Sequence, residues 1–158
     1  MNRIIDRGDG IWQVKVPLPF PLQWVNAYVV VSADGFVDVI DPGIHTEEAE
    51  CRWAEAAETI PFAWNDVRSI VLTHHHPDHY GLAGWMQAKS GAPVKLSARA
   101  LGQARRLWGP EETAGTAADT LALFARHGYP EAEAPAMQAH LDSFVALVSP
   151  QPAAFETV

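Results

Sequence analysis

The chain has 158 residues, of which 48% are hydrophobic and 19% charged, which predicts one folded domain and excludes a disordered chain. Basic residues number 11 and acidic residues 19, a formal net charge of −8, and without a Lys/Arg cluster no nucleic-acid partner is expected. No apolar run reaches the ~18–20 residues of a membrane helix, so no membrane partner is expected either. The lack of a signal-peptide pattern and the single cysteine, Cys51, favour a cytoplasmic location.

The first hundred residues predict alternating strands and helices. One helix is predicted between the N-cap Thr46 and Pro61, and another over Gly81–Lys89, with Gly91 at its C-terminal end. Five segments show the alternation or the β-branched composition of strands, and two of them flank an Asp-Gly pair typical of a hairpin turn. The predicted strands are Ile11–Val16, Ala27–Val31, Phe36–Ile40, Ser69–Thr73 and Val94–Leu96, the last of the chain.

After residue 97 the sequence is rich in alanine and leucine at helical spacing. Helices are predicted over Ala98–Trp108, Ala117–His127 and Ala132–Val148. Residues 1–97 are therefore predicted to form an α/β part, and residues 98–158 a helical insertion or extension. One face of the third helix is apolar, and we expect it to be buried near the histidine cluster and to shape a substrate pocket. That face comprises Met137, Leu141, Phe144, Val145 and Val148.

Four of the seven histidines fall between positions 74 and 79, together with one aspartate. In an extended segment residues i and i+2 point to the same side, so His74 and His76 can present two imidazoles together, whereas His75 points away. A proline after His76 bends the chain and lets Asp78 and His79 turn toward a neighbouring position. Imidazole and carboxylate ligands suit Zn²⁺, and also Fe or Mn. The cluster therefore predicts a metal site, with a histidine-rich surface loop as the alternative.

The segment Thr73-His-His-His-Pro-Asp-His79, followed by Gly81 and Gly84, resembles the T-H-x-H-x-D-H signature of the metallo-β-lactamase superfamily. Two upstream segments resemble the opening hairpin and the aspartate turn of that family: Asn26-Ala-Tyr-Val-Val and Val39-Ile-Asp-Pro-Gly43. The resemblance implies an α/β (α+β) fold, the metallo-β-lactamase-like αββα sandwich. This chain would hold the first half of that fold plus a helical extension.

The resemblance implies two metal ions per complete site. His74 and His76 would be ligands of the first, and Asp78 and His79 ligands of the second, with Asp78 also orienting a bridging hydroxide and so acting as the catalytic residue. The implied cofactor is Zn²⁺, with Fe or Mn possible. The ligands that the family takes from its later half have no counterpart before Val158. The isolated chain is therefore expected to bind metal weakly, to hydrolyse little, and to occur as a homo-oligomer or with a separate C-terminal half.

Four further residues are candidates around the site. The resemblance implies that Asp41 accepts a hydrogen bond from a ligand histidine and fixes its tautomer, although a plain Asp-Pro-Gly turn is an alternative. Thr73 is a candidate for a hydrogen bond nearby, but strand propensity explains it equally well. Phe20 and Trp24, in the proline-rich loop after the first strand, are candidates for an apolar lip against the substrate.

The implied function is that of a metal-dependent hydrolase acting on a small molecule. Metal-bound hydroxide would attack the carbonyl of an ester, thioester, lactone or amide, and thioester cleavage like that of hydroxyacylglutathione hydrolases is the preferred subclass. The alternative is a non-catalytic metal-binding or interaction domain left by truncation of the second half.

Overall fold

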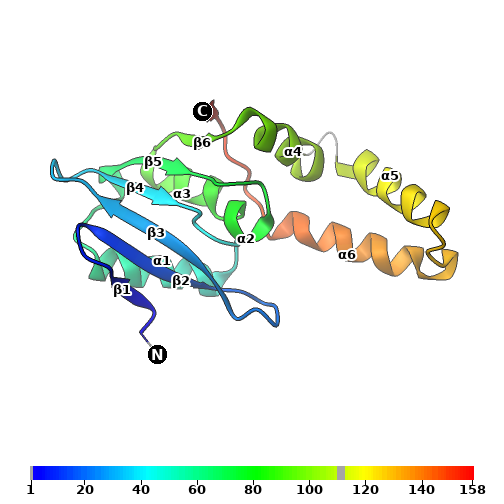
Figure 1. Ribbon diagram of the computed structural model, residues 1–158, viewed down its shortest axis with the longest axis horizontal. Helices are drawn as coiled ribbons and strands as arrows, with labels where there is room; N and C mark the ends of the chain where they lie inside the picture. The colour runs from blue at the N-terminus through cyan, green and yellow to red at the C-terminus, as the bar shows by residue number, and fades with distance from the viewer. Residues whose placement is uncertain (1, 110–112) are drawn as a thin grey trace.

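In the computed structural model, residues 2–109 and 113–158 are described, and their strands form one mixed sheet (Figure 1). The strands lie in chain order, with β1–β4 antiparallel and β4–β7 parallel. Their bounds are Ile4–Asp6 for β1, Ile11–Pro17 for β2, Trp24–Val31 for β3, Val37–Ile40 for β4, Val67–Val71 for β5, Val94–Leu96 for β6 and Phe155–Thr157 for β7. The sheet confirms the expected α/β class and the hairpin between the predicted second and third strands.

Within the described residues, six α-helices and two short 3₁₀ helices connect and extend these strands. None of the helices in the described part of the chain is long and apolar enough to cross a membrane. The α-helices are α1 (Glu47–Thr59), α2 (Pro77–Tyr80), α3 (Ala83–Ser90), α4 (Ala98–Trp108), α5 (Thr113–Arg126) and α6 (Ala134–Ala146), and the 3₁₀ helices are η1 (Trp64–Asp66) and η2 (Glu131–Glu133).

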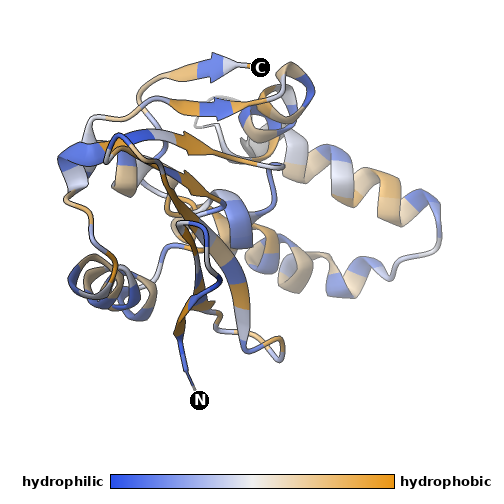
Figure 2. Cartoon of the chain, turned by 60° about the vertical axis from the view of Figure 1, so that its left-hand side comes forward, coloured by the Kyte–Doolittle hydropathy of each residue, from blue (hydrophilic) through white to orange (hydrophobic). Residues whose placement is uncertain are grey.

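One face of the sheet carries the hydrophobic core. Val14, Val29, Val39 and Ile70 lie on this face by strand alternation, and each is fully buried. Helices α1 and α3 cover it from the same side (Figure 2). The N-cap Thr46 starts α1 as predicted, since its hydroxyl accepts the amide hydrogen bond of Ala49 at 3.1 Å. Burial of this one face accounts for every second apolar residue of these strands.

The other face of the sheet is mixed rather than uniformly apolar. Tyr28, Ile40 and Val71 are paired neighbours across β3, β4 and β5, and all three are half-buried. In the same row Gln13 lies beside Tyr28 and Lys95 beside Val71. On this face the apolar surface is thus confined to a strip bordered by polar groups.

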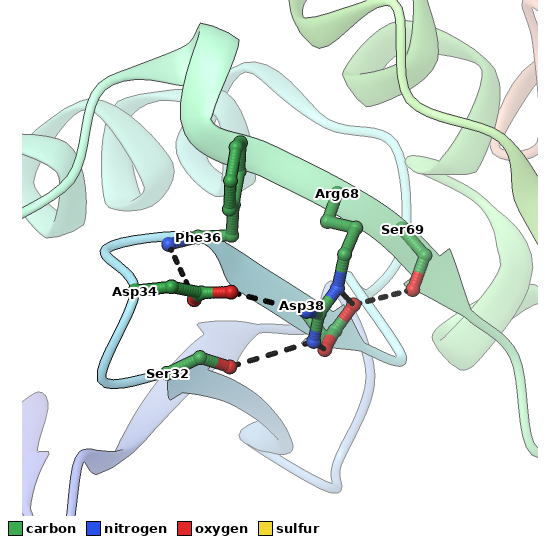
Figure 3. A network of polar contacts seen from close by, with 6 residues as sticks. All are labelled: Ser32, Asp34, Phe36, Asp38, Arg68 and Ser69. Atoms are coloured by element: carbon green, nitrogen blue, oxygen red, sulfur yellow. Dashed lines mark hydrogen bonds and ion pairs between the residues drawn. The ribbon is translucent and has the colours of Figure 1, made fainter.

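A polar network joins β4, β5 and the β3–β4 turn (Figure 3). The Asp38 carboxylate accepts hydrogen bonds from Arg68 Nη2 at 2.5 Å and from Ser69 Oγ at 2.6 Å. The Arg68 hydrogen bond holds the pKa of Asp38 below its usual value, against the opposing effect of burial. Because Arg68 stands at the start of β5, this network fixes the strand at the end opposite to the histidine cluster.

Two strands of the sheet were not predicted from the sequence. The prediction that Val94–Leu96 is the last strand is wrong, because Phe155–Thr157 pairs with it in parallel, so residues 98–158 are not helical throughout. The antiparallel edge strand Ile4–Asp6 was also missed. Each has only three residues, too few to show a period, and each is held by pairing with a partner strand. The division of the chain at residue 97 stays a prediction.

The helices after β6 fall into two groups. Helix α4 lies beside the sheet, whereas α5 and α6 form a hairpin that projects away from it (Figure 1). None of the residues within α6 is fully buried, so the expected burial of its apolar face is wrong for Met137, Leu141, Phe144 and Val145, which are half-buried. Only Val148, just past the helix, is fully buried. The reason is that α6 packs mainly on α5 rather than on the sheet.

Candidate metal centre

The histidine cluster follows β5 at the edge where that strand ends. The backbone is still extended at His76, with φ −64° and ψ 146°. Pro77 then takes the first position of α2, where its fixed φ suits a helix start. The amide of His79 donates to the carbonyl of His76 at 3.0 Å. This single turn carries His79 back beside the extended segment.

The three predicted histidine ligands meet at this turn. The ring centroid of His74 lies 4.5 Å from that of His76 and 4.3 Å from that of His79. Asp78 Oδ2 lies 3.5 Å from His79 Nε2, so the structure brings all four predicted ligands together. The ring of His75 lies 6.4 Å from that of His74 and 5.1 Å from that of His76. Its orientation away from the site stays a prediction.

The four candidate ligand side chains lie close together, but they are not arranged as a complete coordination sphere. Among residues 2–109 and 113–158, no group of three or more His, Cys, Asp or Glu side chains is positioned to hold a metal ion. The donor set of three imidazoles and one carboxylate nevertheless has the chemistry that Zn²⁺, Fe or Mn requires. Closing it around an ion requires reorientation of side chains already in contact.

Asp41 lies behind the cluster and joins three of its groups. Its carboxylate accepts from the Thr73 amide at 2.8 Å, from the Thr73 hydroxyl at 2.7 Å, and from His79 Nδ1 at 3.0 Å. Asp41 is buried, and its φ of 51° lies in the left-handed region that non-glycine residues seldom adopt. Strained backbone of this kind persists where the surroundings hold it in place. The contact to His79 is the one that the resemblance implied for Asp41.

The hydrogen bonds determine which ring nitrogen carries the proton in His74 and His79. Because the Asp41 carboxylate can only accept, the single Thr73 hydroxyl proton points to Asp41. The 2.9 Å contact between Thr73 Oγ1 and His74 Nδ1 is then made by Nδ1–H of His74. His79 likewise donates Nδ1–H to Asp41. In the neutral rings both Nε2 atoms therefore keep their lone pairs for a metal, which is the tautomer that a ligand needs.

The electrostatics of the cluster differ from one side chain to the next. Burial opposes ionisation of Asp41, but the hydrogen bonds from His79 and Thr73 outweigh it and hold its pKa below the usual value. The hydrogen bond to Asp41 raises the pKa of His79. Burial, together with repulsion from His79 and His76, lowers the pKa of His74. The lowered pKa favours His74 in the neutral form that binds metal. The raised pKa keeps His79 protonated up to a higher pH, and it must lose that proton before it can bind a metal.

The Asp41–His79 pair predicts a pH-dependent stability of the metal-free chain. Asp41, with a lowered folded pKa, contributes above its unfolded value of about 3.9, whereas His79, with a raised one, contributes below its unfolded value of about 6.5. Each contribution is lost as the pH passes through the folded pKa, downward for Asp41 and upward for His79. Asp41→Asn should therefore cost roughly 1–3 kcal/mol of unfolding free energy between about pH 4 and 6.5, and less outside that window. Urea unfolding across this range measures it; a loss independent of pH would contradict the ion pair.

The hydroxyl of Thr73 predicts a second effect. Thr73→Val removes the acceptor of His74 Nδ1–H while keeping the shape of the side chain, so Zn²⁺ affinity should fall about 10–100-fold. Thr73→Ser keeps the hydroxyl and should stay close to the natural protein. Competition with a chromophoric chelator measures both affinities. Equal affinities for the two variants would contradict the role of the hydroxyl.

The two candidate lip residues have different neighbours. Phe20, in the β2–β3 loop, is 37% exposed, and its ring centroid lies 6.1 Å from that of Phe144 in α6. Trp24 begins β3, where Lys15 Nζ lies 4.5 Å from its ring centroid on the mixed face of the sheet. Phe20 therefore lies against the helical hairpin, whereas Trp24 contacts Lys15 of β2. Contact of either residue with a substrate stays a prediction.

Sequence reasoning missed the residues that fasten the helical segment to the cluster. Trp108 Nε1 at the end of α4 donates to the carbonyl of His75 at 2.8 Å. The His45 amide donates to the Leu147 carbonyl at 3.0 Å, and the His45 ring bridges Glu50 and the carbonyl of Ser149. These contacts join positions far apart in the chain. No short-range pattern in the sequence could have signalled them.

Comparisons with known proteins show which family the chain belongs to. Residues 24–141, about three quarters of the chain, match the family model described as "Metallo-beta-lactamase superfamily". The chain belongs to the metallo-beta-lactamase superfamily. It is 38% identical, over 74 residues, to the probable metallo-hydrolase YqjP of Bacillus subtilis (strain 168), a match that covers 47% of this chain and 23% of that protein.

Solved structures of the superfamily share the fold. A metallo-beta-lactamase family protein from Thermus thermophilus superposes with a TM-score of 0.73 at 30% identity, covering 94% of this chain and 46% of that one. A beta-lactamase domain protein from Burkholderia ambifaria gives a TM-score of 0.69 at 21% identity, covering 98% and 43%. The chain thus spans less than half the length of these superfamily relatives. The metallo-beta-lactamase-like fold expected from the sequence is confirmed.

Proposed function

We propose that the chain carries the metal-binding half of a metal-dependent hydrolase that cleaves an ester, thioester, lactone or amide, with a thioester preferred. The observation that carries the proposal is the convergence of His74, His76 and His79 behind which Asp41 fixes two ring tautomers. Bound Zn²⁺ would lower the pKa of water and polarise a carbonyl group. Membership of the superfamily and the metallo-hydrolase relative support this chemistry.

The residues of the chain would divide the work around the metals. His74 and His76 would hold one ion, and Asp78 and His79 the second. The Asp78 carboxylate would also accept a hydrogen bond from a hydroxyl group beside the reacting carbonyl and so orient that group, since Asp78 lies next to His79 Nε2. Asp41 would hold His79, and through Thr73 also His74, in the orientation that binds metal.

The mixed face of the sheet supports a proposal about partners. The strip of Tyr28, Ile40 and Val71 is half-buried in the isolated chain, and contact with a second α/β half or with another copy of the chain would bury it further. The four candidate ligands would then be completed from that partner, because closed zinc sites use at least three protein ligands per ion.

A reducing cytoplasm suits a chain with one free cysteine.

A second candidate function is a non-catalytic metal-binding domain. It is favoured by the unfinished coordination sphere among the described residues. Zinc binding and zinc-dependent hydrolysis of a generic thioester, measured on the same preparation, separate the two functions.

We expect weak zinc binding with slow hydrolysis that a chelator abolishes. Zinc binding without any zinc-dependent hydrolysis would favour the non-catalytic domain. Hydrolysis that survives both the chelator and the loss of His74 and His76 would overturn the proposal.

A further inference from the structure

Two of the three histidine rings in the cluster are fixed by hydrogen bonds, and the third is not. His74 Nδ1 contacts the Thr73 hydroxyl at 2.9 Å, and His79 Nδ1 contacts the Asp41 carboxylate at 3.0 Å. Among residues 2–109 and 113–158, no group forms a hydrogen bond with the ring of His76. The placement of that ring therefore depends on its packing and on the backbone that carries it.

The backbone of His76 is held on both sides. On the C-terminal side, its carbonyl accepts from the amides of His79 and Tyr80 at 3.0 and 2.9 Å, which joins it to the start of α2. On the N-terminal side, the carbonyl of His75 accepts from Trp108 Nε1 at 2.8 Å. A peptide group is planar, so a bond that holds the His75 carbonyl also orients the plane that carries the Cα of His76. The indole of Trp108 thus acts on the one ring that has no hydrogen bond of its own.

Helix α4 gives Trp108 a rigid base beside the sheet (Figure 1). Ala100, Ala104 and Trp108 follow one another at a spacing of four residues, so they share one face of the helix. The two alanines are buried, and Trp108 packs, half-buried, against the hydrophobic core. An indole fixed in this way can hold a peptide group of the segment after β5 without reaching the metal itself.

We propose that Trp108 is a positioning residue of the candidate metal centre, which holds His76 in place through the carbonyl of His75. This inference rests on the proposed function and adds to it a role for α4 in metal affinity. Residues that orient a ligand from outside the coordination sphere change metal affinity about 10–100-fold. Trp108 acts through the backbone rather than on the ring, so we expect the lower end of that range.

Zinc titration of Trp108→Phe tests the proposal. Phenylalanine keeps an aromatic ring against the core but removes the N–H donor, so Zn²⁺ affinity should fall about tenfold. The matched control is Trp85→Phe in α3, where the indole is also half-buried but donates no hydrogen bond within the described part of the chain. This control should keep the affinity of the natural chain. Competition with a chelator measures both affinities, after urea unfolding has shown that each variant is folded.

NMR of the histidine ring nitrogens in the metal-free chain separates positioning from a general structural role. The ring signals of His76 should shift and broaden in Trp108→Phe. Those of His74 and His79 should change little, because both rings keep their own hydrogen bonds. A variant that merely loosened the fold would alter all three rings together.

The natural chain offers a measurement that needs no variant. Coupling between two binding events is reciprocal. If the indole bond tightens zinc binding about tenfold, zinc should slow hydrogen exchange at Trp108 Nε1 by the same factor. Exchange that zinc leaves unchanged would contradict the coupling.

Two further results would overturn the inference: an equal loss of zinc affinity in Trp108→Phe and Trp85→Phe, or His76 ring signals that do not change in Trp108→Phe. A natural chain that binds no zinc would overturn the proposed function instead. In that case the ring signals of the metal-free chain would still decide whether Trp108 positions His76.

Discussion

Replacing both His74 and His76 with alanine is expected to lower zinc affinity at least a hundredfold and to abolish stoichiometric metal in the purified chain. Both rings meet within 4.5 Å, between centroids, and His74 is held in the metal-binding tautomer through Thr73. Loss of a residue that merely supports a ligand costs about 10–100-fold, so loss of two ligands must cost more. Elemental analysis of the protein after dialysis against zinc measures this directly.

The control for that experiment is His75→Ala. His75 neighbours the same rings, and its carbonyl accepts a hydrogen bond from Trp108, but the alternation of the extended segment predicts that its side chain points away from the site. We expect its zinc content to remain nearly unchanged. Unchanged zinc in the double variant, or lost zinc in His75→Ala, would contradict the ligand assignment.

Replacing Gly84 with alanine is expected to have the largest effect on stability. A Cβ at this position would lie 2.0 Å from the carbonyl oxygen of Pro150 and 2.6 Å from the carbonyl carbon of Gln151. Both obstacles are backbone atoms of the segment between α6 and β7, so a rotamer change cannot relieve the clash. We expect a loss of roughly 3 kcal/mol in the free energy of unfolding, the upper end for overpacking.

The matched control for Gly84 is Gly102→Ala in α4. No atom lies within 4 Å of a Cβ built at Gly102, and alanine is the better helix former by about 1 kcal/mol. This variant should therefore be neutral or more stable. Thermal and urea unfolding of both variants measure the difference. A Gly84→Ala variant as stable as the natural chain would contradict the close packing of residues 150–151 on α3.

The sequence predicted the elements whose own residues specify them. Thr46 and the Asp34-Gly35 pair act through contacts within a few positions, and the structure confirms the helix start and the hairpin. The histidine cluster could be predicted for the same reason, since its residues are nearly consecutive. The remaining features depend on pairing over long distances. Strand β7 exists because it pairs with β6.

The same distinction holds within the candidate site. Asp41 reaches Thr73 and His79 across 32 and 38 positions, and only the resemblance to a family pointed to it. Trp108 could be expected to be apolar and packed, but its bond to the carbonyl of His75 depends on where α4 ends in space. The sequence correctly predicted that one face of α6 is apolar. That face packs on α5 rather than on the sheet.

X-ray absorption at the zinc edge tests the central claim most directly. Zinc bound to the chain should show two or three imidazole nitrogens at about 2.0–2.1 Å and no sulfur ligand, and this signal should vanish in the variant that lacks His74 and His76. A spectrum with a sulfur neighbour from Cys51, or an imidazole signal that persists in the variant, would contradict the assignment of the metal centre to the cluster after β5.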